Sequence, residues 1–290
     1  MKRASWGMAA ILVLGLSGCA GKPAPPSATE LLIIPATSME STPQPPSSLP
    51  PSDKHGPNPI SVAAAVQQVT RATTAAVVID RQTGTTLVSE NADRPFDSGS
   101  LIKVLIGLDA LARHPHDNSV TSQVSAMIKF SDDDLASSFW GNEGGPLIIV
   151  RMARTMGLQS IKPPSPPGMW GWTRLTANDM IRTYDYLTHS APELDRDVVL
   201  KAMAAAAPAG KDGFDQRFGI PHALGDDYEW AIKQAWATDP STRSLHTSGF
   251  VGKGWRYEVV VMTEYPRATS WATGVRAIDA GTGTIASVLS

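Results

Sequence analysis

The sequence of 290 residues is poor in cysteine, in long apolar runs and in excess charge of either sign. Its only cysteine is Cys19, which excludes a disulfide within the chain. The 25 Lys and Arg residues stand against 27 Asp and Glu residues, and the net charge of −2 gives no support for nucleic-acid binding. No apolar stretch approaches the roughly 18 residues that a transmembrane helix needs. The six histidines show no metal-ligand spacing.

Residues 1–18 predict a secretory signal peptide. A basic start is followed by an apolar stretch from Met8 to Leu16 and then by small residues. The segment Leu16-Ser17-Gly18-Cys19 is similar to the bacterial lipobox, whose cysteine receives a diacylglyceryl group and becomes the new N-terminus. Two or more acyl chains on Cys19 would hold the protein stably in a lipid bilayer. We therefore expect an exported lipoprotein anchored to the outer face of the bacterial plasma membrane; a plain signal peptide with a chance cysteine is the alternative.

Residues 19–59 predict a disordered tether, because residues 20–59 contain 11 of the 23 prolines together with many Ser and Thr residues. The remaining residues, 60–290, are numerous enough for one good-sized domain. The tether would let this domain stand off the membrane.

Residues 60–290 predict two early strands, a block of helices, three late strands and a closing helix. The expected elements are a helix at 61–71, strands at 75–80 and 85–89, helices within 120–227, strands at 230–236, 244–251 and 257–265, and a final helix at 271–289. This order favours an α+β fold, in which a five-stranded antiparallel sheet is flanked by N- and C-terminal helices and carries a helical lobe.

Ser100 and Lys103 lie three residues apart at the start of a strongly apolar run. Residues 96–99 predict a loop that ends in a helix N-cap, since Asp97 and Ser98 can accept the free amide hydrogens of a first turn. The spacing puts Ser100 and Lys103 on one helix face. A desolvated lysine has a lowered pKa and can act as a base towards a hydroxyl. In the alternative interpretation, Ser100 only caps the helix and Lys103 reaches the surface.

A second cluster of polar residues, Ser131-Asp132-Asp133, follows 31 residues after Ser100. Taken alone, it has an ordinary explanation, because acidic residues cap helices and are stabilised near their positive ends. Gly144-Gly145-Pro146 and Met156-Gly157 come after it in the chain.

Together these features resemble the penicillin-recognising serine hydrolases, in particular the class A β-lactamases and their lipoprotein relatives. That family has S-x-x-K at the start of a buried helix, S-D-N on a loop of the helical lobe, and K-T-G on a late strand. Ser100 and Lys103 match the first motif, and Ser131-Asp132-Asp133 matches the second. The resemblance covers about residues 60–290 and implies a β-lactamase/transpeptidase-like fold.

The third motif has two candidate positions. Lys233-Gln234-Ala235 is preferred, because it lies on an apolar strand and leaves two strand candidates after it, as in the family. The second choice is Leu245-His246-Thr247-Ser248-Gly249, in which histidine replaces the lysine.

The resemblance implies that Ser100 attacks the amide carbonyl of a β-lactam or a peptidoglycan peptide and becomes acylated. Lys103 then takes or relays the proton, and Ser131 passes a proton to the leaving nitrogen. Lys233 supplies positive charge for a substrate carboxylate, and the backbone N–H groups of Ser100 and Trp236 form the oxyanion hole. The residues implied to lie beside the substrate are Asp133, Gln234, Trp236 and, for the second choice, His246. No metal or organic cofactor is implied.

Four departures from the family bear on activity. Asp133 replaces the asparagine of S-D-N, and Gln234-Ala235 replaces Thr-Gly. Residues 158–176, where class A enzymes carry the glutamate that activates the deacylating water, contain no Asp or Glu. The gap from Ser100 to Ser131 is short, which predicts a reduced helical lobe. Slow deacylation is the expected consequence.

Three functions remain open at the level of sequence. The first is an envelope acyl-serine hydrolase acting on amides. The second is a catalytically impaired binding module for cell-wall fragments or envelope proteins, which Trp170, Trp172 and Trp255 would suit. The third is an esterase that uses Ser100 and Lys103 on small esters. The sequence does not fix the natural substrate or the oligomeric state.

Overall fold

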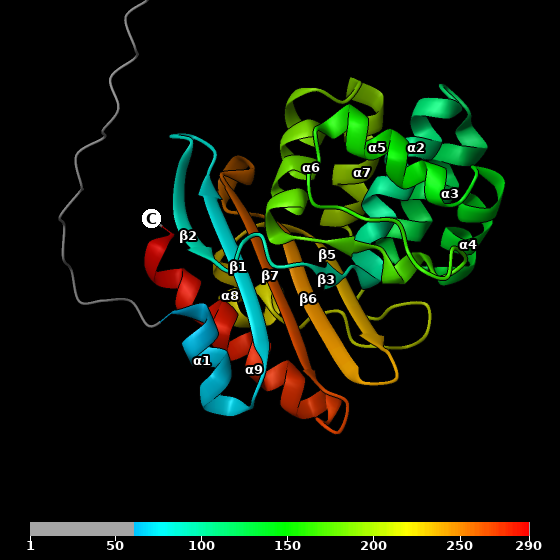
Figure 1. Cartoon of the computed structure of the whole chain (residues 1–290). Coiled ribbons are helices and arrows are strands. Elements are labelled where there is room, and N and C mark those ends of the chain that lie inside the picture. Colours follow the sequence, from blue (N-terminus) through cyan, green and yellow to red (C-terminus); the bar gives the residue numbers. More distant parts are fainter. Residues whose placement is uncertain (1–60, 290) are drawn as a thin grey trace, which may run out of the picture. The chain divides into compact units, whose positions relative to one another are not determined.

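The computed structural model of the protein describes residues 61–289 (Figure 1). The predicted signal peptide, Cys19 and the predicted tether lie outside the described residues. All of the sheet and both apolar cores described below lie within residues 61–289, so this part contains what it needs to fold by itself.

A five-stranded antiparallel sheet forms the centre of this part, as the sequence predicts. Its order is β2-β1-β7-β6-β5, so the two early strands and the three late strands join through the pairing of β1 with β7. The strands are β1 (Thr73–Asp80), β2 (Thr85–Glu90), β5 (Trp230–Thr238), β6 (Thr242–Val251) and β7 (Tyr257–Pro266). Two short strands, β3 (Phe96–Asp97) and β4 (Arg174–Leu175), pair separately.

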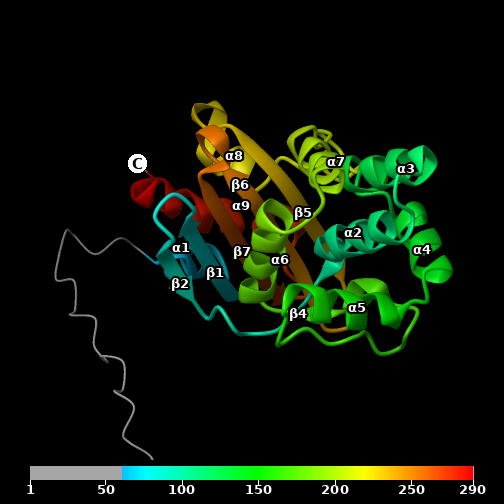
Figure 2. The ribbon, with the colours of Figure 1, turned by 90° about the horizontal axis from the view of Figure 1, so that it is seen from above.

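Helices cover both faces of the sheet (Figures 1 and 2). One face carries the chain-terminal helices and a short third helix: α1 (Val62–Val69), α9 (Trp271–Gly283) and α8 (Ile220–Leu224). The other face carries the helical lobe: α2 (Lys103–Arg113), α3 (Asn118–Lys129), α4 (Asp133–Asn142), α5 (Pro146–Met156), α6 (Ala177–His189) and α7 (Glu193–Ala204). The fold is therefore α+β, with the layers that the sequence predicts.

The strand β1 shows why a continuous apolar run becomes a central strand. Ala75 and Val77 point into the core shared with the helical lobe, whereas Ala76 and Val78 point into the core shared with α1 and α9. Successive side chains of a strand face opposite sides, so a strand covered on both faces needs apolar residues at every position.

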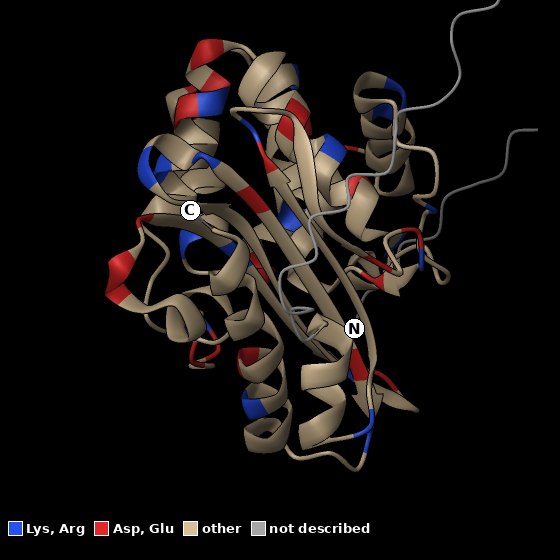
Figure 3. Cartoon of the chain, turned by 90° about the vertical axis from the view of Figure 1, so that its left-hand side faces the viewer, with Lys and Arg blue, Asp and Glu red and all other residues tan. Residues whose placement is uncertain are grey.

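Basic and acidic residues are interspersed over the helices, loops and strands in the view of Figure 3. Among the described residues, no helix is both long and apolar enough to cross a membrane.

The structure corrects one local prediction, the N-cap of the helix that carries Lys103. The chain enters α2 through a 3₁₀ turn, η1 (Gly99–Ile102), and Ser98 makes no capping hydrogen bond. The Ser98 hydroxyl instead donates to the carbonyls of Gly99 and Gly171, and the Asp97 carboxylate accepts from Arg174. Ser98 thus connects the turn to Gly171, and Asp97 connects β3 to β4; neither side chain caps the helix.

Candidate active site

Ser100 lies in the turn η1, which runs beside the edge strand β5. Gly99 has a φ of 48°, and a Cβ at this residue would lie 3.1 Å from the Cβ of Ala235. Glycine is required here both for the left-handed backbone and for the close approach of the turn to the strand. The methyl group of Ala235, where the family has glycine, is accommodated because residue 99 has no side chain.

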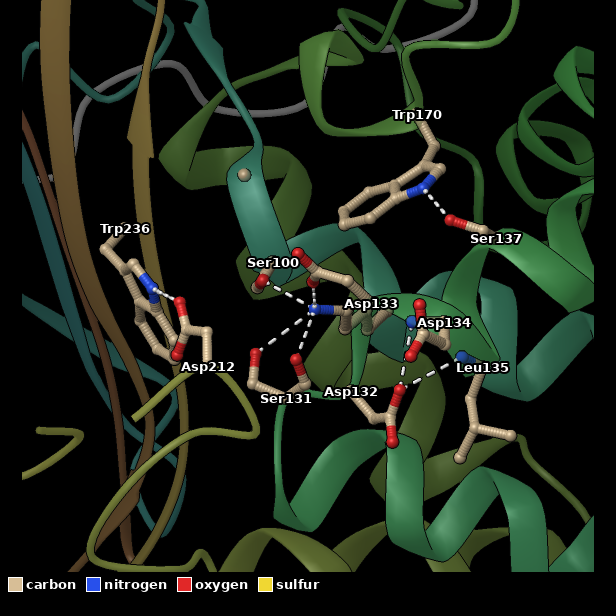
Figure 4. A network of polar contacts seen from close by, with 12 residues as sticks. Ser100, Ser131, Asp132, Asp133, Asp134, Leu135, Ser137, Trp170, Asp212 and Trp236 are labelled. Atoms are coloured by element: carbon tan, nitrogen blue, oxygen red, sulfur yellow. Dashed lines mark hydrogen bonds and ion pairs between the residues drawn. The ribbon is translucent and has the colours of Figure 1, made fainter. Parts of the chain in front are cut away.

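The amine of Lys103 is completely buried and lies among four oxygen atoms (Figure 4). Its Nζ is 2.7 Å from Ser100 Oγ, 2.8 Å from Ser131 O, 3.2 Å from Ser131 Oγ and 2.5 Å from Asp133 Oδ1. An ammonium group has three hydrogens, so the three shortest contacts satisfy it. Ser100 and Lys103 therefore form a hydrogen-bonded pair, as nucleophile and base must in acyl-serine chemistry.

Ser131 reaches Lys103 because its backbone is left-handed. Its φ is 51°, a conformation that costs a non-glycine residue on the order of 1 kcal/mol. In return, both its carbonyl and its hydroxyl oxygen face Lys103, and Lys233 Nζ donates to the same hydroxyl at 2.8 Å. The next residue, Asp132, caps α4 through the amides of Asp134 and Leu135. The Ser-Asp-Asp segment thus performs both functions that the sequence suggests: capping and site formation.

The buried amines of Lys103 and Lys233 both contact the hydroxyl group of Ser131. Burial lowers the pKa of Lys103, and the nearby carboxylate of Asp133 opposes this shift. Burial and the positive charge of Lys103 together hold the pKa of Lys233 well below its usual value. Lys233 Nζ donates to Ser131 Oγ and to Gln234 O, both at 2.8 Å, and these two bonds suit the two hydrogens of a neutral amine.

Asp133 covers the lysine cluster from the solvent side. Its side chain is 68% exposed, although its Oδ1 contacts the buried Lys103 amine. Asparagine would offer Lys103 only an amide oxygen, whereas a carboxylate stabilises the ammonium form by direct charge pairing. The substitution of Asp for Asn in the S-D-N motif therefore favours protonated Lys103.

A cleft of about 400 Å³ opens over Ser100 and is called the Ser100 cleft below. Its walls include Asp133 and three indole rings, those of Trp170, Trp172 and Trp236. The Trp170 ring centroid is 4.9 Å from Lys103 Nζ, and its Nε1 donates to Ser137 Oγ at 3.1 Å. Trp170 lies in the short helix η2 (Trp170–Trp172), with its ring over the Lys103 amine and its Nε1 directed at Ser137 (Figure 4).

A second hollow, of about 330 Å³, adjoins the cleft at Asp133. It is lined by Ser131, Asp133, Asp134, Lys211 and Asp212. Asp212 Oδ2 accepts from Trp236 Nε1 at 2.8 Å, which links this hollow to the far wall of the Ser100 cleft (Figure 4).

Lys233 and Trp236 lie at the site, whereas three other sequence candidates do not. Gln234 is 1% exposed, and its amide nitrogen donates to the carbonyls of Gln216 and Phe218. His246 lies on the inner strand β6 with no exposed surface, 2.9 Å from Asp97 O, and burial lowers its pKa to about 4. Trp255 is not part of the cleft lining.

Lys233 itself is 1% exposed, so it presents no surface to a substrate carboxylate. This differs from the role that the resemblance implies for it. The physical reason is that the amine is satisfied inside the protein, by the hydroxyl of Ser131 and the backbone carbonyl of Gln234 on β5.

Ser137 and Asp212 line the site, and sequence reasoning did not find them. Ser137 is four residues after Asp133 on α4, so helical periodicity places it on the same face and was a usable signal. Asp212 lies on a loop that is distant in the sequence from all three motifs, and no sequence pattern indicated that it would line the site. Among residues 61–289, no group of three or more His, Cys, Asp or Glu side chains is arranged to hold a metal ion.

Comparison with known proteins shows to which family the chain belongs. The chain is 34% identical over 218 residues to a protein named "Putative lipoprotein LppW" in Mycobacterium tuberculosis and Mycobacterium bovis, and the match covers 71% of this chain and 68% of that protein. The chain belongs to the LppW family. No profile of a known protein family matches the chain.

Solved class A β-lactamases share the fold of this LppW-family chain. The enzyme from Bacteroides cellulosilyticus has a TM-score of 0.61 at 12% identity, covering 79% of this chain and 98% of that one. The β-lactamase from Streptomyces albus G has a TM-score of 0.60 at 19% identity with the same coverage. An ancestral class A β-lactamase has a TM-score of 0.62 at 17% identity, covering 79% and 100%. At these identities the likeness shows the fold alone.

The ion pair between Asp133 and Lys103 generates the first prediction. Replacing Asp133→Asn removes the carboxylate that stabilises the ammonium, so the pKa of Lys103 should fall further below its usual value. If neutral Lys103 activates Ser100, the reaction of Ser100 with a fluorophosphonate should then reach half its maximal rate at a lower pH. The pH dependence of that rate is the measurement.

Asp134→Asn is the matched control, because Asp134 is adjacent in the chain but has no hydrogen bond to Lys103. Its pH profile should stay near that of the wild type. A profile for Asp133→Asn that is unchanged, or that moves to higher pH, would contradict the electrostatic role of the carboxylate.

Proposed function

We propose that this protein is an envelope-anchored serine acyl-transfer protein, in which Ser100 attacks an amide or ester carbonyl and forms an acyl-enzyme that breaks down slowly. The observation that carries the proposal is the 2.7 Å contact between Ser100 Oγ and the fully buried Lys103 amine. A buried lysine bonded to a serine that lines a cleft is the arrangement that nucleophilic catalysis requires.

The proton path follows from the shared hydroxyl of Ser131. Burial lowers the pKa of Lys103, so a fraction of the protein holds this amine neutral, with its proton released to solvent. Lys103 is then neutral and takes the proton of Ser100 as Oγ bonds to the carbonyl carbon. When the acyl bond breaks, the leaving nitrogen or oxygen receives a proton back through Ser131.

The oxyanion would be held by two backbone N–H groups, those of Ser100 and Trp236. This assignment is supported by the packing of η1 against β5, where Gly99 lies directly beside Ala235. Donors fixed in the backbone need no reorganisation as charge develops on the carbonyl oxygen.

Slow deacylation is supported by the loop that faces the acyl site. Residues 158–176 contain no carboxylate to activate a water molecule. The indole of Trp170 lies over Lys103 and is fixed by its bond to Ser137. An apolar ring at this point excludes water from one side of the ester, so an acyl group on Ser100 should persist.

Membrane attachment is proposed through Cys19. The lipobox-like segment at residues 16–19 supports it, and so does the printed name of the LppW relatives, "Putative lipoprotein LppW". Export, removal of residues 1–18 and acylation of Cys19 would place the folded part outside the plasma membrane, at the end of a proline-rich tether.

A second candidate, the non-catalytic binding module, is favoured by one contact. Asp133 pairs with Lys103 at 2.5 Å and holds it as an ammonium, which cannot accept the proton of Ser100. As a binding module, the protein would use the Ser100 cleft and its tryptophans to bind a cell-wall fragment without cleaving it.

Acylation can be measured directly as an increase in intact mass. Residues 60–290 should gain one adduct after incubation with a fluorescent penicillin or a fluorophosphonate, and the Ser100→Ala variant should gain none. Ser100→Ala should remain folded, with the loss of one hydrogen bond to the buried Lys103 amine lowering the free energy of unfolding by about 1 kcal/mol. No adduct with either reagent would overturn the catalytic proposal and leave the binding module.

The role of Trp170 is testable through the lifetime of that adduct. Trp170→Ala uncovers the acyl site to water, so the adduct should disappear at least about tenfold faster, while Trp170→Phe should keep most of the protection. Time-resolved intact mass after removal of excess reagent gives the rate. Equal lifetimes in Trp170→Ala and the wild type would mean that the ring does not exclude the attacking water.

A further inference from the structure

Most of the charged residues that line the Ser100 cleft and the adjoining hollow are acidic. Asp133 lines the cleft itself, and Asp134 and Asp212 join it in the adjoining hollow. The one ammonium in this lining is that of Lys211, which lies 3.9 Å from a carboxylate oxygen of Asp132. With the paired groups included, the four carboxylates of Asp132, Asp133, Asp134 and Asp212 stand against the two ammonium groups of Lys211 and Lys103, so the charge around the hollow is negative.

The ammonium groups that could balance this negative charge, those of Lys103 and Lys233, are buried inside the protein. Lys103 has no exposed surface and Lys233 has 1%, and both amines are satisfied by internal oxygens. Gln234, at the position that would otherwise offer a polar group beside them, donates its amide hydrogens to Gln216 and Phe218 behind the sheet. A substrate carboxylate would therefore meet carboxylates and no free cation among the described lining residues.

The aromatic walls bear on the same ligand charge. Trp236 is stacked on Phe214, with ring centroids 4.9 Å apart and planes 11° apart, so its indole is held rigidly. Its Nε1 bonds Asp212 Oδ2 and thereby fixes a carboxylate at the edge of the ring. A rigid indole beside an anchored carboxylate suits an ammonium group, which gains from both the π-face and the charge.

We propose that the Ser100 cleft selects acyl substrates that carry a free ammonium group, bound beside Trp236 and Asp212, over substrates that carry a carboxylate near the scissile bond. The substrate class is an amine-bearing peptide. This deepens the proposed function, since it rests on the Ser100 cleft being the substrate site, but it concerns binding and holds whether or not Ser100 is acylated.

Three peptides of one skeleton test the charge preference. They are Nα-acetyl-lysyl-D-alanyl-D-alanine amide, its Nε-acetyl derivative and its Nε-succinyl derivative, with side-chain charges of +1, 0 and −1. Binding to the Ser100→Ala variant of residues 60–290 is followed by tryptophan fluorescence and calorimetry, so that no chemistry intervenes. The cationic peptide should bind about fivefold more tightly than the neutral one, a gap of about 1 kcal/mol, and the anionic peptide most weakly. The gap should shrink in 0.5 M NaCl.

Substitutions of single carboxylates identify the residues responsible for the charge preference. Asp212→Asn in the Ser100→Ala background should abolish most of the cationic advantage, and Asp134→Asn should reduce it. Asp195→Asn is the matched control, because this carboxylate lies in a separate groove at the start of α7 and its removal should change nothing. Thermal unfolding of each variant confirms that it is folded.

Equal affinities for the three peptides, the reverse order, or no binding of the cationic peptide at millimolar concentration would overturn the proposal. These outcomes are distinct from failure of acylation. If the wild type forms no adduct with penicillin or fluorophosphonate but the charge order holds, only the catalytic proposal falls. If adducts form without a charge preference, only the inference about the substrate falls.

Discussion

The burial of the Lys103 amine is the constraint on which the rest of the site depends. An ammonium taken out of water is costly unless hydrogen bonds and charge replace its hydration. Three chain segments supply these partners: the turn η1 through Ser100, the segment that leads into α4 through Ser131, and α4 itself through Asp133. The left-handed backbone of Ser131 is maintained because it turns two oxygens towards this one amine.

A second buried lysine changes what the site can do. Lys103 and Lys233 cannot both remain charged at low cost, and Lys233 carries the larger shift because it has no carboxylate partner of its own. Its withdrawal from the surface suits a proton relay through Ser131 and removes it as an anchor for a substrate anion. Asp133, Asp134 and Asp212 then set the charge that a ligand meets, so the interior and the entrance of the site differ in sign.

The fold could be predicted because the hydrophobic patterns of its strands and helices are local and recur along the chain. The apolar strands, their order around a helical block and the S-x-x-K pattern gave the five-stranded sheet and the pairing of Ser100 with Lys103. The N-cap at Ser98 was predicted wrongly, since a 3₁₀ turn is set by contacts with Gly171 and β5, which sequence spacing does not encode. Gln234 was misplaced for a similar reason: motif order says which residue follows Lys233, but strand alternation sends its side chain to the opposite face. Asp212 could not be predicted as a site residue, because it lies on a loop whose sequence has no periodic pattern.

The protonation of the two buried lysines is the most direct test of this account. Lysines labelled with ¹³C at Cε can be titrated by NMR, with Lys103→Arg and Lys233→Arg variants for assignment. Two resonances should titrate below the ordinary lysine value of about 10.4, and the lower midpoint should belong to Lys233. If every lysine resonance titrates near about 10.4, the shared-proton site does not exist, and Ser100 has no base in this structure.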